Sequence, residues 1–145
     1  MKVSLKRLNN DVLFQANNEN GNSILIDGNP AIGGRDAGFR PMELLLAAIG
    51  GCSVMDIISI LKKQRQDVQN VYIDVTGDRE KEDEVSIYKK IHLHYTLESS
   101  PEGTIDEKKA EKAIELGVYK YCSVGRMLEK DAEISYSFTI KKAGN

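Results

Sequence analysis

The sequence has little that would support binding to nucleic acid. Its 20 lysine and arginine residues are outnumbered by 22 acidic residues, which gives a net charge of −2. No run of adjacent basic residues is longer than the pair Lys62-Lys63, so a broad surface that tracks a phosphate backbone is not supported. We therefore expect no nucleic acid partner.

Several motifs of metal and cofactor chemistry are also missing. The two cysteines, Cys52 and Cys122, stand 70 residues apart and form no CxxC, and there is no GxSxG and no HExxH. His92 and His94 share one face of a predicted strand, but two ligands are too few for a metal site. The glycine-rich segment 33–38 lacks the Lys-Ser/Thr of a phosphate-binding loop. We expect no metal and no cofactor.

Long apolar runs are scarce as well. The N-terminal segment lacks the uninterrupted apolar stretch of a secretory signal, so we expect a cytoplasmic protein whose cysteines begin reduced. The most apolar stretch, 44–61, contains Ser53 and Asp56 together with Gly50-Gly51. An acidic residue is costly at the centre of a bilayer, so this stretch predicts a helix buried in protein and not a membrane span.

What is present is an ordinary globular composition, 41% hydrophobic and 29% charged, over 145 residues. This length predicts one domain over residues 1–145. Alternating and helical spacings predict an α+β order, βββ-α-ββ-αα-β, not a doubly wound fold. The expected elements are strands around 3–5, 12–14 and 23–26, a loop at 27–40, a helix over 41–65, strands at 71–75 and 85–97 joined by a charged turn, a helix capped by Thr104 or Asp106 and ending at Cys122, a short helix at 123–130 and a strand at 134–140.

Two interpretations are open for each cysteine. Cys52 lies in the middle of the apolar helix, where a free cysteine often packs as a small hydrophobe. A reactive Cys52 needs an outside cation to stabilise its thiolate, and Arg35 and Arg40 in the preceding loop are the available donors. Arg126, four residues after Cys122, could serve that cysteine if the helix continued, or it could simply be solvated.

Two sequence blocks together resemble the OsmC/Ohr superfamily of osmotically inducible and organic hydroperoxide resistance proteins. The first, PMELLLAAIGGCSVMDI at 41–57, resembles the family's proline-led helix before a cysteine. The second, KYCSVGRML at 120–128, resembles the segment around its second cysteine. The spacing of the blocks and the order of elements fit over essentially the whole chain.

The resemblance implies an intertwined homodimer, with antiparallel sheets packed on a long buried central helix. It also implies a thiol peroxidase that acts on organic hydroperoxides in the response to oxidative stress. Cys52 would be the peroxidatic cysteine and Cys122 the resolving one. As the activating cation we favour Arg35, because it lies in a glycine-rich loop that can fold over a cysteine, whereas Arg40 is held close to the start of the helix. Arg40, Glu43 and Arg126 are candidates for supporting positions. An external dithiol, such as a dihydrolipoyl group, would reduce the resulting disulfide.

One position departs from the family pattern. Family peroxidases usually have a glutamate immediately after the proline, and Met42 occupies that position here. Glu43 follows one residue later and, on a straight helix, points away from Cys52. A second function therefore stays open: a dimeric protein that binds a small ligand near the cysteines, or senses redox state, without significant turnover.

Overall fold

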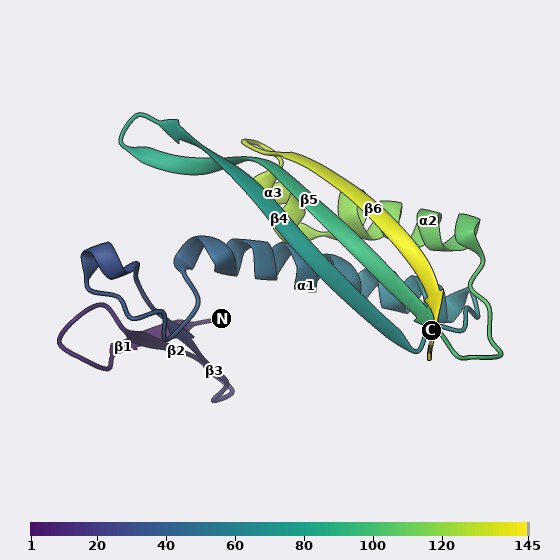
Figure 1. The fold of residues 1–145 in the computed structure, drawn as a ribbon, viewed down its shortest axis with the longest axis horizontal. Coiled ribbons are helices and arrows are strands. Elements are labelled where there is room, and N and C mark those ends of the chain that lie inside the picture. Colours follow the sequence, from purple (N-terminus) through teal and green to yellow (C-terminus); the bar gives the residue numbers. More distant parts are fainter. Residues whose placement is uncertain (145) are drawn as a thin grey trace. The chain divides into compact units, whose positions relative to one another are not determined.

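The computed structural model describes residues 1–144, which form two compact units, Met1–Leu45 and the chain from Leu46 onward. The predicted α+β class and the order of elements are confirmed: the chain has two three-stranded sheets and a central helix (Figure 1). One domain over residues 1–145 stays a prediction.

The first unit is built on a small antiparallel sheet. Strands β1 (Val3–Arg7), β2 (Phe14–Asn18) and β3 (Ser23–Ile26) pair in that order, which confirms the expected hairpin and third strand. Gly21, at φ 84°, supplies the left-handed backbone that the second turn requires. The expected loop at 27–40 contains one short 3-10 helix, η1 (Pro30–Ile32).

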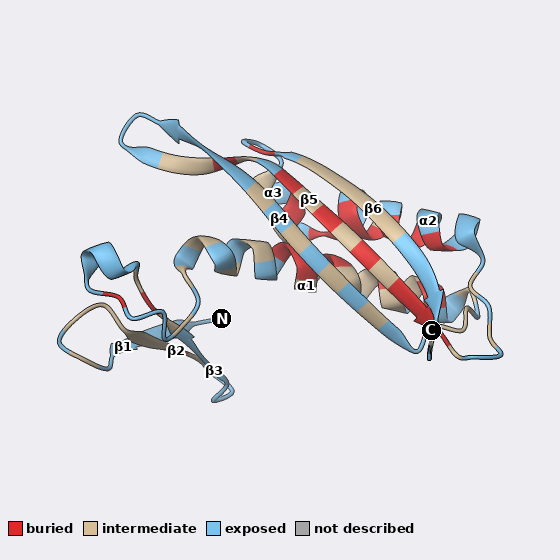
Figure 2. Ribbon diagram, viewed as in Figure 1, coloured by how far each residue is buried: buried red, intermediate tan, exposed pale blue. Residues whose placement is uncertain are grey.

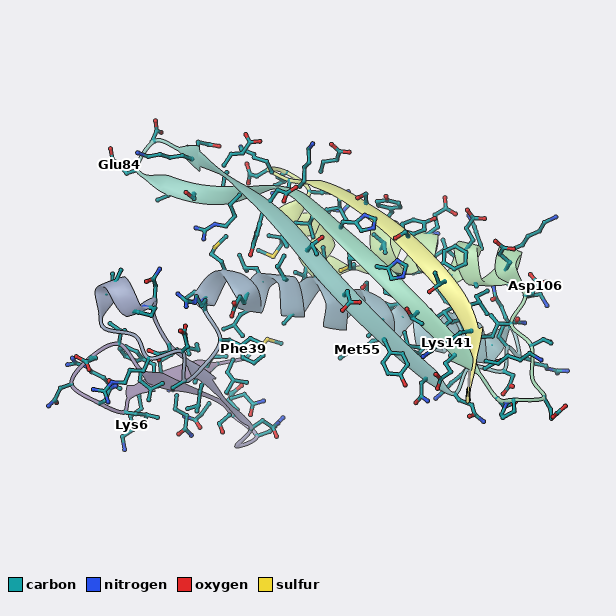
Figure 3. All side chains as sticks on the ribbon, in the orientation of Figure 1. Lys6, Phe39, Met55, Glu84, Asp106 and Lys141 are labelled. Carbon is teal, nitrogen blue, oxygen red and sulfur yellow. The ribbon has the colours of Figure 1, made fainter. Side chains whose placement is uncertain are left out.

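Helix α1 (Pro41–Lys63) begins at the predicted proline and ends two residues before the expected end at 65. Four of its buried residues, Ile49, Ser53, Ile57 and Leu61, lie four positions apart and form one stripe, and Gly50 is buried beside them. The remaining apolar side chains are less covered, and Met55, labelled in Figure 3, is 73% exposed. By length and composition this helix could also cross a membrane, a test that core helices of soluble proteins pass too.

The second sheet is mixed. Strands β4 (Asn70–Glu82) and β5 (Val85–Ser99) form the predicted antiparallel hairpin, whereas β6 (Glu133–Lys142) pairs with β5 in parallel. The expectation of wholly antiparallel sheets was wrong for this pair. Between β5 and β6 the chain returns through helices, and such a crossover is the connection that parallel neighbours require.

The charged segment 77–84 is mostly strand, although the sequence predicts a turn there. β4 continues to Glu82, and only Asp83 and Glu84 form the turn, with Asp83 at φ 53°. The charges are satisfied along an exposed ribbon: Arg79 donates to the Ser86 carbonyl and Lys89 pairs with Glu82. A charged run excludes a buried strand, but it is compatible with an exposed edge.

The crossover contains α2 (Glu107–Glu115), η2 (Leu116–Tyr121) and α3 (Ser123–Leu128). Of the two proposed capping residues, Asp106 caps α2, because its carboxylate accepts the backbone N–H of Lys109 at 2.9 Å. The helix does not continue as an α-helix to Cys122 as expected, since η2 is a π-helix.

The core of the second unit lies on the face of the sheet formed by alternate residues of β5. Figure 2 shows the alternation along this strand as bands of buried and partly buried residues. The buried apolar side chains from this face are Ile91, Leu93, Tyr95 and Leu97. Tyr95 contacts α1 directly, so this face supports the helix that contains Cys52.

Candidate active site

The fold brings Cys52 and Cys122 together, although they lie 70 residues apart in the sequence. Cys52 is half-buried in the middle of α1, and Cys122 is buried between η2 and α3. Cys52 lies close enough to Cys122 to raise the pKa of the Cys122 thiol, and neither cysteine is in a disulfide. The Cys122 Sγ also lies 3.9 Å from the Ile49 carbonyl oxygen of α1.

The surroundings of Cys122 favour its thiol form. Burial is the main cause that raises its pKa to about 11. The hydrogen bond from the Gly125 N–H, with an N–Sγ distance of 3.1 Å, opposes this rise, and the neighbouring Cys52 adds to it. At neutral pH Cys122 is therefore protonated, which suits a thiol that acts second and not the first nucleophile.

Glycine allows the segment before Cys122 to pack closely on α1. A Cβ atom added at Gly117, in η2, would lie 2.4 Å from Ile57 Cγ1 and 3.0 Å from the Ser53 carbonyl oxygen. Single-turn π-helices are often found at functional sites. Here the close approach of η2 to α1 places Cys122 beside the turn that contains Cys52.

Sequence reasoning missed two residues at this site, Ser53 and Tyr95. Both side chains are fully buried, and their hydroxyl oxygens lie 2.6 Å apart. The signal was a serine in a buried apolar helix next to a candidate nucleophile, together with a tyrosine among the apolar residues of a strand. Each alone is common, and only the three-dimensional structure shows that they meet.

The expected arginine loop is organised by Asp27, which the sequence analysis also missed. This buried carboxylate accepts backbone N–H bonds from Gly28, Arg35 and Ala37, with N–O distances of 2.8, 2.9 and 3.0 Å. The bonds from Ala37 and Arg35 are the largest causes that lower the pKa of Asp27 below its ordinary value of 3.8. Gly34 makes the tight fold possible, because a Cβ there would lie 1.8 Å from the Gly28 carbonyl oxygen.

The two arginines of this loop differ in how firmly their partners hold them. Arg35 is paired with Asp11 at 3.4 Å and its side chain is 76% exposed. Arg40 forms an ion pair with Asp36, and the Glu43 carboxylate accepts its backbone N–H at 2.9 Å. Glu43 thus stabilises the start of α1. Because Arg35 has only a weak, exposed partner, it is the more available cation.

Arg126 and the two histidines of β5 are engaged in other side-chain contacts. Arg126 is 71% exposed and pairs with Glu129 at 2.8 Å. Both ring nitrogens of His92 hydrogen-bond to Ser135 and Ser137 at 2.8 Å, as does one nitrogen of His94 to Ser137. Within residues 1–144, no group of three or more His, Cys, Asp or Glu side chains is placed to hold a metal ion.

Comparison with known proteins gives the family. The model of the OsmC-like protein family matches residues 33–137, which include both cysteines. The chain belongs to the OsmC-like family. It is 35% identical over 130 residues to Protein YhfA of Escherichia coli strain K12, covering 90% of this chain and 91% of that protein.

Solved structures agree with this assignment. A hypothetical protein from Aquifex aeolicus is 32% identical, with a TM-score of 0.75 and 96% coverage of both chains. The organic hydroperoxide resistance protein OhrB of Bacillus subtilis has a TM-score of 0.67 over 95% of this chain and 96% of its own, but at 15% identity it is similar in fold alone. Membership of the OsmC-like family indicates a redox or peroxidase-related role.

We expect Asp27→Asn to loosen the arginine loop at neutral pH. An amide offers one acceptor oxygen in place of two, so either the Gly28 N–H or both the Arg35 and Ala37 N–H groups face another donor. Hydrogen exchange at the amides that lose their acceptor should then accelerate roughly tenfold. Because the folded-state pKa of Asp27 is lowered, its stabilisation is present above about pH 3.8 and is lost as the pH falls through the folded value.

Nuclear magnetic resonance measures both effects. The amide shifts of Arg35 and Ala37 should titrate below pH 3.8 in the wild type and stay constant in Asp27→Asn. Asp83→Asn, in the exposed hairpin turn, is the matched control and should leave the loop unchanged. Equal exchange rates in all three proteins would show that Asp27 does not organise the loop.

Proposed function

We propose that this protein is a thiol peroxidase that reduces organic hydroperoxides. The observation that carries the proposal is that its only two cysteines, both reduced, lie close enough to interact, with the Cys122 segment packed on the helix that contains Cys52. Such a pair suits two-step cysteine oxidation, because a second thiol beside the first prevents irreversible overoxidation. The OsmC-like family makes the same role plausible.

The chemistry proceeds in three steps. The Cys52 thiolate attacks the distal oxygen of the hydroperoxide, the O–O bond breaks, and the alkoxide takes a proton and leaves as an alcohol. Cys122 then attacks the sulfur of the Cys52 sulfenic acid, and the S–O bond breaks. The departing oxygen takes the Cys122 proton and leaves as water. An external dithiol, of the dihydrolipoyl class, reduces the disulfide and is itself oxidised to a disulfide.

The protonation of Cys122 is consistent with this order. Its pKa, raised to about 11 chiefly by burial, keeps it from competing with Cys52 for the peroxide at neutral pH. In the second step its proton is needed to form water. The asymmetry between a buried thiol and a half-buried one therefore supports Cys52 for the first step and Cys122 for the second.

We further propose that Arg35 activates Cys52. Its guanidinium has one exposed partner, Asp11, at 3.4 Å, and a surface ion pair of this kind is worth about 0–1 kcal/mol. Arg40 is held by Asp36 and by the bond from its own backbone to Glu43. Release of Arg35 toward a thiolate therefore costs less than release of Arg40.

We also propose a cytoplasmic homodimer. Of the residues described in Met1–Leu45, only Ala16, Asp27 and Gly34 are buried, which is too small a core for 45 residues. This unit also has an apolar hollow of about 310 Å³ lined by residues such as Leu5, Phe14 and Ile32. With the uncovered side of α1, these surfaces are best explained by a second copy of the chain.

The peroxidase proposal predicts a defined oxidation product. After one equivalent of cumene hydroperoxide, intact-mass spectrometry should show loss of two hydrogens, and peptide mapping should place a disulfide between Cys52 and Cys122. In Cys122→Ser, oxidation should stop at Cys52 sulfenic or sulfinic acid. In Cys52→Ser, the rate of peroxide consumption should fall about 100-fold or more. An unmodified wild-type mass after prolonged exposure would instead favour the ligand-binding or redox-sensing function.

The two arginines can be separated by matched substitutions. We expect Arg35→Ala to slow oxidation of Cys52 about 10-fold to 100-fold, because the thiolate loses its cation, and Arg40→Ala to slow it less. The rate is measured by trapping the sulfenic acid under pseudo-first-order peroxide. Arg126→Ala, on the exposed surface, is the control. A larger effect of Arg40→Ala than of Arg35→Ala would reverse the assignment.

The dimer is tested by sedimentation velocity at micromolar and lower concentrations, where the wild type should remain dimeric. Met55→Glu places a charge on the uncovered side of α1 and should dissociate or unfold the protein. Met127→Glu, in α3, is the matched control, since the two methionines are 73% and 74% exposed. A folded wild-type monomer at micromolar concentration contradicts the proposal, as does an equal response of the two variants.

A further inference from the structure

A buried pair of hydroxyl groups links the core strand β5 to the turn of α1 that contains Cys52. Tyr95 and Ser53 are both 0% exposed, and their oxygens lie 2.6 Å apart. Ser53 Oγ also donates to the Gly50 carbonyl oxygen at 3.0 Å. Loss of the Ser53 hydroxyl leaves the buried Tyr95 hydroxyl without this partner, whereas loss of the Tyr95 hydroxyl leaves Ser53 bonded to Gly50 but no longer tied to the sheet.

The direction of these hydrogen bonds follows from the number of protons. A serine hydroxyl has one proton, and the Ser53 proton goes to the Gly50 carbonyl. Tyr95 must therefore be the donor to Ser53. The result is a single chain from the sheet into the helix, in which Tyr95 donates to Ser53 and Ser53 to Gly50, with Cys52 lying between the last two residues in sequence.

The same turn of α1 contacts the Cys122 segment on another side. The Ser53 carbonyl oxygen lies against Gly117, and the Ile49 carbonyl oxygen lies 3.9 Å from the Cys122 Sγ. Burial raises the pKa of Tyr95 to about 12, the hydrogen bond with Ser53 opposes the rise, and the neighbouring Cys122 adds to it. The hydroxyl pair is thus close to the second thiol as well as to the first.

We propose that the Tyr95–Ser53 hydrogen bond positions Cys52 for disulfide formation with Cys122, an inference that rests on the proposed peroxidase function. Successive residues of an α-helix are rotated by about 100°, so fixing Ser53 on the sheet fixes the direction of Cys52. A rotation of about 10° at a side-chain radius of about 5–6 Å moves a sulfur atom by about 1 Å. Disulfides need Cβ atoms about 3.5–4.5 Å apart, so such a shift matters.

The two steps of the reaction depend differently on this hydrogen bond. Attack on a peroxide does not involve Cys122, and the substrate can adjust to the position of the Cys52 sulfur. Attack by Cys122 on the Cys52 sulfenic acid needs both sulfur atoms in place, since one S–S bond forms while the S–O bond breaks and water leaves. Loss of the Tyr95 hydroxyl should therefore slow the second step and spare the first.

Tyr95→Phe is the test variant, because it removes the hydroxyl and keeps the ring. After rapid mixing with cumene hydroperoxide, we expect the rate of disulfide formation to fall about tenfold, and sulfenic acid formation to change by less than about threefold. The fraction of Cys52 that becomes sulfinic acid should rise accordingly. Quenched-flow mass spectrometry measures all three species.

The chain offers matched controls. Tyr72→Phe removes a hydroxyl from a tyrosine of β4 that is 51% exposed, and it should behave as wild type. Ser53→Ala should reproduce Tyr95→Phe, and it serves as the second variant if Tyr95→Phe does not fold. The double variant should be no slower than either single one, because both substitutions remove the same bond.

A peroxide-free measurement separates this inference from the proposed function. In the exchange of the reduced protein with oxidised glutathione, the protein disulfide forms and two glutathione molecules are released. Tyr95→Phe should lower this equilibrium constant about tenfold relative to wild type and to Tyr72→Phe. If this shift occurs while the wild type consumes no peroxide, the peroxidase proposal fails and the positioning role holds.

A purely structural role gives a different result. In that case Tyr95→Phe lowers the free energy of unfolding but leaves both the glutathione equilibrium and the sulfinic acid fraction at their wild-type values. That outcome overturns the inference. So does a wild-type protein that forms no disulfide between Cys52 and Cys122 by either route.

Discussion

The second unit depends on one stripe of helix α1 packed against the inner face of the sheet. Ile49, Ser53, Ile57 and Leu61 are four residues apart and are all buried. Three of them contribute apolar area, whereas Ser53 contributes a directional bond to Tyr95. Apolar packing tolerates small rotations of a helix, but a hydrogen bond between buried hydroxyls has a preferred length and angle. Ser53, the polar member of the stripe, therefore fixes the rotation of the helix about its axis, and this rotation sets the direction of the Cys52 side chain.

The pairing of the two cysteines explains the polar and glycine residues around them. Cys122 reaches α1 only because η2 approaches closely at Gly117. Its burial, which this approach causes, raises the pKa of its thiol to about 11. Packing and chemistry are thus linked at one residue: the contact that brings the second thiol to the first also keeps it protonated, as the proposed second step requires.

Much of this fold could be predicted from the sequence, because hydrophobic periodicity decides the type of long elements. The start of α1 at Pro41 and the alternation along β5 are examples. The charged segment of β4 was not predicted as strand, since its charges are satisfied by pairing with β5 across the hairpin turn, which residue types alone do not show. The parallel pairing of β6 was missed for a related reason: alternation shows which residues share a face but not the direction of the neighbouring strand.

In the candidate site too, some residues could be predicted from the sequence and others could not. The cysteines and the arginine loop could be found from residue types and from the family resemblance. Asp27 could not, because an acidic residue beside a glycine is also common in ordinary turns, and its three N–H partners lie up to ten residues later in the chain. Tyr95 was interpreted only as one apolar position of a strand, because its hydroxyl gains a role only through a partner on another element.

Met42, in place of the usual family glutamate, changes which carboxylates are available to the arginine loop. A glutamate in that position would offer a carboxylate to an arginine, and this chain supplies carboxylates to its arginines from elsewhere. Asp36 pairs with the Arg40 guanidinium, and Glu43 accepts the Arg40 backbone N–H. Asp11 pairs with Arg35, but at 3.4 Å and in solvent. Acidic residues in and around the loop thus hold one arginine firmly and the other weakly, and the weakly held one is the arginine proposed to activate Cys52. Under the proposed activation of Cys52 by Arg35, the absence of the glutamate changes which carboxylates orient the cation and does not remove the cation itself.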